Sequence, residues 1–85
     1  MRLDQLPFRQ PAIVSAIDWS ALSEGDGKRL RNLGFDEGVE IEALHAAPWG
    51  RDPLAVRIGR MTVAMRRAQA GAVSVHVQRL DLAAE

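Results

Sequence analysis

The sequence has 85 residues but no cysteine, no tyrosine and only two histidines. Without cysteine, the chain cannot form disulfides, use a thiolate in catalysis, or hold zinc or an iron–sulfur cluster through cysteine. So few nucleophiles and general bases argue against an enzyme, because proton transfer and covalent attack need such groups. A phosphate-cradling glycine loop is also missing, since Gly25 and Gly27 are not followed by Gly-Lys-Ser or Gly-Lys-Thr.

Net charge and long apolar runs are missing as well. Eleven basic residues balance eleven acidic ones, so a strongly cationic nucleic-acid-binding protein is not expected. No segment approaches the roughly 20 apolar residues of a membrane span, and the N-terminal residues contain no apolar signal core. We therefore expect a cytoplasmic protein without direct membrane insertion, folded as one domain over residues 1–85.

Four prolines and seven glycines divide the chain into short segments, which favours several short strands over long helices. Alternating apolar residues predict five strands, and one short α-helix is predicted after the first of them. The strands are expected at residues 12–19, 39–45, 54–58, 61–65 and 73–78, and the helix at residues 20–34. The prediction is a mainly β protein that closes into a small barrel, because closure removes open sheet edges.

The hydrophobic pattern also predicts strand register. Gly59-Arg60 is a two-residue turn of the kind that closes a tight antiparallel hairpin. The expected cross-strand neighbours are Ile58 and Met61, Val56 and Val63, and Glu42 and Arg57. Met61 and Met65 fall on the inward-facing side of this pattern, so both are expected in the core, as is Trp19.

The two histidines are candidate metal ligands, because imidazole commonly binds zinc and other divalent metals. His45 lies beside a predicted loop, and His76 lies on the outward-facing side of the last strand. Their spacing is not that of a local metal motif, and a closed site needs about four ligands. They are therefore either ordinary surface histidines or ligands of a site that is shared between two chains.

Charge is segregated along the chain although it sums to zero. Residues 36–42 contain acidic but no basic residues, and residues 57–79 contain basic but no acidic residues. The two signs either pair across neighbouring strands or form a surface that orients a protein partner. The basic segment has no aromatic residue to stack on bases, so no nucleic-acid partner is expected.

Trp49 occupies a Pro-Trp-Gly loop next to Arg51. A tryptophan at a loop tip is either an anchor for a partner or a cap that folds back over the barrel. The sequence alone leaves both alternatives open.

Three segments together resemble a known family. Residues 29–35, Arg-Leu-Arg-Asn-Leu-Gly-Phe, followed by Gly38, resemble the "RLxxLGFxxG" segment of the ferrous iron transport protein A (FeoA) family. Residues 48–53, Pro-Trp-Gly-Arg-Asp-Pro, resemble its "PxGDP" loop, with Arg51 as an insertion, and residues 63–66 resemble its "IALR" segment.

This resemblance implies an SH3-like β-barrel that is an accessory protein, not an enzyme, of the bacterial ferrous iron transporter FeoB. The partner is then the cytosolic face of FeoB with its GTP-hydrolysing G domain, and a weak homodimer is also allowed. The residues expected to bind the partner are Leu22, Lys28, Arg29, Arg31, Trp49 and Arg51. No cofactor is required, although a surface site could hold iron or zinc. The alternative is a metal-responsive regulatory domain related to the C-terminal module of iron-dependent repressors.

Overall fold

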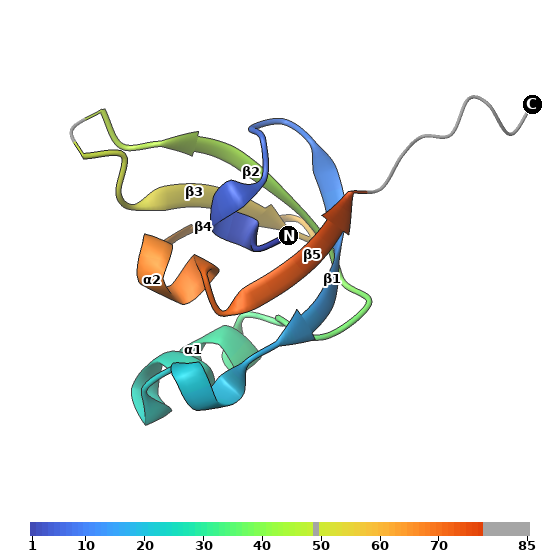
Figure 1. The fold of residues 1–85 in the computed structure, drawn as a ribbon, viewed down its shortest axis with the longest axis vertical. Helices are drawn as coiled ribbons and strands as arrows, with labels where there is room; N and C mark the ends of the chain where they lie inside the picture. Colours follow the sequence, from blue (N-terminus) through green and yellow to red (C-terminus); the bar gives the residue numbers. More distant parts are fainter. Residues whose placement is uncertain (49, 78–85) are drawn as a thin grey trace, which may run out of the picture.

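Five strands form one antiparallel sheet in the order β4-β3-β2-β1-β5 (Figure 1). The structure is a computed structural model, and it describes residues 1–48 and 50–77. The strands are β1 (Pro11–Ile17), β2 (Glu40–Ala46), β3 (Leu54–Ile58), β4 (Met61–Met65) and β5 (Val73–Val77). The helices are α1 (Glu24–Asn32) and the single turn α2 (Arg67–Ala70), with 3-10 turns η1 (Leu3–Gln5) and η2 (Trp19–Ala21). The strand predictions are confirmed to within two residues.

The predicted register is confirmed across the β2–β3–β4 part of the sheet. The structure pairs Ile58 with Met61, Val56 with Val63, and Glu42 with Arg57. Gly59 has a φ of 60°, a conformation that glycine adopts without a steric penalty, and it begins the two-residue turn between β3 and β4. The turn and the apolar alternation therefore specify the same pairing.

The expected closure of the barrel is not observed. Among the described residues, β4 and β5 lie at opposite ends of the strand order, and no ladder joins them. Register shifts between Val14 and Ala16 in β1 and between Ala43 and His45 in β2 increase the local twist. The sheet curls strongly as a result, and β1 pairs with both β2 and β5 (Figure 1).

The core lies inside this curled sheet and draws on every strand, on α1 and on the N-terminal segment. Its fully buried large side chains are Leu3, Val14, Leu30, Ile41, Leu54, Val56, Met65, Val73 and Val75. Met65 is in the core as predicted, but Met61 is 45% exposed, so that prediction was wrong. Met61 follows the turn on β4, which is the outermost strand among the described residues.

The predicted helix begins later than expected. Leu22 is in an extended conformation (φ −103°, ψ 148°), which separates η2 from α1. Ser23 caps α1 by accepting a hydrogen bond from the Asp26 amide at 3.0 Å. At the other end, Gly34 has a φ of 97°. The Phe35 amide donates to the Leu30 carbonyl at 3.0 Å, which is the long bond of a Schellman motif.

No helix within residues 1–48 and 50–77 combines the length and the apolar character that spanning a membrane requires.

Candidate functional site

A surface hollow of about 380 Å³ lies between η2 and α1. We call it the α1 hollow; its lining includes Trp19, Leu22, Glu24, Lys28 and Arg31. The guanidinium carbon of Arg31 lies 4.3 Å from the centroid of the Trp19 ring, which is a cation–π contact. Trp19 was predicted in the core, but it is only half-buried and packs against the core with part of its surface. Aromatic, aliphatic and cationic groups therefore meet in one concave surface.

Three of the residues predicted to bind a partner line the α1 hollow, namely Leu22, Lys28 and Arg31. Arg29 is directed elsewhere, since its Nη2 donates a hydrogen bond to the Ala64 carbonyl of β4 at 3.0 Å. Trp49 lies outside the described residues. The predicted set is therefore divided between separate parts of the surface.

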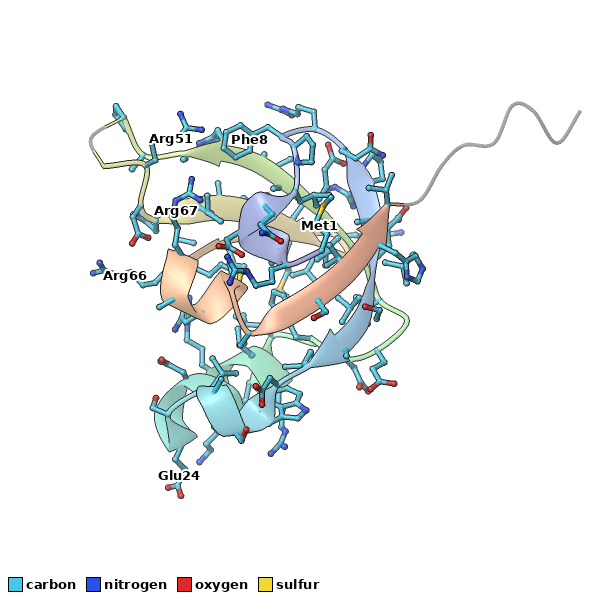
Figure 2. All side chains as sticks on the ribbon, viewed as in Figure 1. Met1, Phe8, Glu24, Arg51, Arg66 and Arg67 are labelled. Atoms are coloured by element: carbon cyan, nitrogen blue, oxygen red, sulfur yellow. The ribbon has the colours of Figure 1, made fainter. Side chains whose placement is uncertain are left out.

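The other predicted loop residue, Arg51, lies at the opposite end of the molecule from α1. Its guanidinium carbon is 5.6 Å from the Phe8 ring centroid, and Figure 2 shows both residues far from Glu24 of α1. A second hollow of about 420 Å³, the N-terminal hollow, has Asp4, Phe8, Arg51 and Arg67 in its lining. The backbone at Arg51 is left-handed, with a φ of 57°. The turn thereby places its guanidinium over an aromatic ring that also belongs to the surface.

Arg67 forms hydrogen bonds to several segments around the N-terminal hollow. Its backbone amide donates to the Asp52 carboxylate at 3.0 Å, and its Nε donates to the Arg51 carbonyl at 2.7 Å. Its Nη1 donates to the Asp4 carbonyl at 3.3 Å. Arg67, the first residue of α2, thus connects α2 to the β2–β3 loop and to η1. Figure 2 shows Arg67 below Arg51.

Phe8, Asp52 and Arg67 were not predicted as site residues from the sequence. Phe8 could have been predicted as a surface contact residue, because it is an aromatic residue between Pro7 and the polar residues Arg9 and Gln10. It does not belong to an alternating apolar pattern that would place it in the core. Asp52 and Arg67 have no such local signal, because their contacts join residues 15 or more positions apart.

The two histidines lie on different strands and do not meet. His45 of β2 is exposed and pairs with Ala55 of β3, whereas His76 of β5 is exposed and pairs with Ile13 of β1. Across the residues that the structure covers, no group of three or more potential metal ligands is found. Within the described part of the chain, neither histidine therefore belongs to a group of three potential ligands.

Among residues 1–48 and 50–77, the two segregated charged segments form one ion pair across the sheet. Arg57 Nη2 lies 2.9 Å from Glu42 Oε1, in line with the predicted register. Both side chains are partly shielded, with 33% and 17% of their surface exposed, respectively. Cross-strand pairing therefore accounts for one member of each charged segment, and Arg60 and Arg66 remain exposed.

Comparisons with known proteins identify a family. The family model for the FeoA domain matches residues 1–77 of this chain. Among solved structures, iron(II) transport protein A from Clostridium thermocellum is 30% identical with a TM-score of 0.79, over 91% of this chain and 45% of that one. FeoA from Chlorobium tepidum is 32% identical with a TM-score of 0.81, over 95% of this chain and 73% of that one. No significant match was found among curated proteins.

A third similar structure is FeoA from Stenotrophomonas maltophilia, which is 33% identical with a TM-score of 0.76 over 89% of both chains. That protein is described as a prokaryotic SH3 domain protein in complex with zinc, with a suggested role as an activating factor of bacterial ferrous iron transport. The present chain spans less than half the length of the Clostridium thermocellum protein and nearly all of the Stenotrophomonas one. It belongs to the FeoA family, the accessory proteins of ferrous iron transport, and has their SH3-like fold.

Proposed function

We propose that this protein binds the ferrous iron transporter FeoB on the cytoplasmic side of the membrane and regulates it by docking through the α1 hollow. The single observation that carries the proposal is the stack of Arg31 on Trp19 beside Leu22. Tryptophan and arginine are among the residue types that are enriched at the energetic hot spots of protein interfaces. Here both are already in contact in the free protein, so little side-chain ordering is needed on binding.

The lining of the α1 hollow indicates what the partner presents. Lys28 and Arg31 supply positive charge, Glu24 supplies negative charge at the start of the helix, and Leu22 supplies an apolar wall. A partner with a projecting apolar side chain next to a carboxylate fits this combination. Charges of both signs around an apolar centre orient a partner and reject others.

The protein acts in this proposal as a binding module and has no catalytic step of its own. Regulation then depends on how FeoB responds to the docked domain, in particular on the nucleotide state of its G domain. The N-terminal hollow around Arg51 is a second surface available to the same partner, at the far end of the molecule (Figure 2).

The test is a titration of isotope-labelled protein with the cytosolic region of FeoB, once with GDP and once with a GTP analogue. We expect shifted signals at Leu22, Lys28 and Arg31 and at the Trp19 indole. Arg31→Ala should weaken binding about tenfold or more, as truncation of an interface anchor does. Arg9→Ala is the matched control, because Arg9 is an exposed arginine outside the α1 hollow.

Two results would contradict docking through the α1 hollow. One is an unchanged spectrum in both nucleotide states. The other is a set of shifts confined to Phe8, Arg51 and Arg67, which would move the contact to the N-terminal hollow.

A metal-responsive role is the second candidate, because the Stenotrophomonas relative was solved with zinc. In the present chain it would require His45 or His76 to recruit ligands from a second copy, since neither belongs to a three-ligand group among the described residues. Calorimetry with zinc or ferrous iron on the wild type, His45→Ala and His76→Ala tests this role. Binding that both variants retain would exclude these histidines as ligands.

A further inference from the structure

The two edge strands of the sheet, β4 and β5, differ in whether other residues cover their outer edge. The edge of β5 is covered by the N-terminal residues, because the Val75 amide donates to the Met1 carbonyl at 2.7 Å and Arg2 forms a bridge with Ser74. The edge of β4 has no such cover within the described residues, since β4 is the last strand in the sheet order. An uncovered edge offers its backbone groups to another extended chain.

The hairpin register identifies which backbone groups of β4 point away from β3. A two-residue turn makes its flanking pair, Ile58 and Met61, a hydrogen-bonded pair, and bonded and non-bonded pairs then alternate along the ladder. Thr62 and Ala64 fall in the non-bonded positions, so their N–H and C=O groups point away from β3. The hydrogen bond from Arg29 to the Ala64 carbonyl agrees with this direction, because it reaches β4 from outside the sheet.

The side chains along this edge leave room for a partner strand. Met61 is 45% exposed, and Thr62 and Ala64 are exposed as well. Met61 is the large apolar residue among them, and its flexible thioether adapts to differently shaped neighbours. The edge therefore combines outward-pointing backbone groups with an accessible apolar contact.

The charge around the β4 edge selects among possible occupants. Arg60 precedes the strand and Arg66 follows it, both exposed, and Arg29 reaches the strand from α1. Figure 2 shows Arg66 directed away from the body of the protein. The sequence contains no acidic residue between positions 53 and 80. A second copy of β4 would bring arginines against arginines, whereas an acidic chain would be attracted.

We propose that the edge of β4 binds an extended acidic segment of a partner protein by strand addition. The N–H groups of Thr62 and Ala64 donate to the segment, and the Thr62 carbonyl accepts from it. Arg29 then leaves the Ala64 carbonyl and pairs with a carboxylate of the segment, which frees that carbonyl as a further acceptor. The inference rests on the proposed function for the existence of a protein partner, but the edge is tested separately below.

The probe is a short blocked peptide in which glutamate and valine alternate, titrated onto the labelled protein. We expect hydrogen exchange of the Thr62 and Ala64 amides to slow about tenfold at saturation, while the amides of Met61 and Val63, already bonded to β3, change little. A peptide with lysine in place of glutamate should bind about tenfold more weakly, because three exposed arginines then repel it.

Thr62→Pro removes one outward N–H donor without removing a hydrogen bond to β3, so it should weaken binding of the glutamate-containing peptide about tenfold. Thr62→Val, which keeps that N–H, is the matched control and should bind like the wild type. If Thr62→Pro fails to fold, Arg60→Gln and Arg66→Gln provide the test, since each should reduce binding and its salt dependence. Equal binding of the two peptides would overturn the inference, as would protection of Thr62 and Ala64 that grows with protein concentration alone.

Failure of the edge and failure of the FeoB proposal are distinguishable. If the peptide does not bind but FeoB shifts the Trp19 indole signal, docking through the α1 hollow is supported and strand addition at the β4 edge is rejected. If the peptide protects the Thr62 and Ala64 amides but FeoB shifts no signal, strand addition at the β4 edge is supported and the partner is a protein other than FeoB.

Discussion

Replacing Gly34 with alanine should destabilise the protein, because Gly34 has a φ of 97° at the end of α1. Alanine in a left-handed conformation costs about 1–2 kcal/mol through the contact of Cβ with the backbone. No atom lies within 4 Å of the position that this Cβ would take, so the cost is conformational and not a clash with neighbours. For a domain of this size, we expect the melting temperature to fall by about 4–16 °C.

Gly25→Ala is the matched variant in the same helix and should have the opposite sign. Gly25 is inside α1 without a left-handed φ, and no atom lies within 4 Å of its added Cβ. The alanine should stabilise by up to about 1 kcal/mol, because it loses less conformational freedom on folding. Thermal and urea unfolding of both variants provide the measurement. A Gly34→Ala protein as stable as the wild type would refute the reasoning from the Schellman motif.

Three further perturbations have definite expected outcomes. Met65→Ala should cost about 2–5 kcal/mol in urea unfolding because Met65 is 1% exposed, whereas Met61→Ala, at 45% exposure, should stay within about 0.5 kcal/mol. Arg67→Ala should cost about 1–2 kcal/mol, because two charged hydrogen bonds to backbone carbonyls are lost, and calorimetry should show it; an unchanged melting temperature would contradict their contribution. Glu42→Gln should cost about 0.2–1 kcal/mol at low salt and less at high salt, because its partly exposed pair with Arg57 is screened; a loss that does not depend on salt would count against this.

The strand register could be predicted from the sequence because the relevant information is local. The two-residue turn at Gly59 and the apolar alternation on each side of it allow one pairing that buries the correct face. The end of α1 was predictable for the same reason, since Gly34 and Phe35 adjoin the helix that they terminate.

The rest depends on contacts between distant residues. In the described part of the chain, Met1 covers the edge of β5 whereas β4 is an uncovered edge strand. No local pattern in the sequence distinguishes the two edges, and this is why the sequence predicts a closed barrel with Met61 in the core. Arg67 is distant in sequence from both Asp52 and Asp4, and no spacing rule connects them. The candidate site was predicted in part, because the basic residues of α1 are visible in the sequence but their separate directions are not.

Those directions follow from helix geometry at residues 29–31. Successive residues of an α-helix are rotated by about 100°, so three consecutive side chains point to three sides of the helix. Leu30 is fully buried in the core, which leaves Arg29 on the side that reaches the Ala64 carbonyl of β4 and Arg31 on the side that covers Trp19. The two flanking arginines therefore cannot serve one surface. The Arg-Leu-Arg segment anchors α1 to the core through Leu30 and supplies a cation to each of the two proposed binding surfaces, the β4 edge and the α1 hollow.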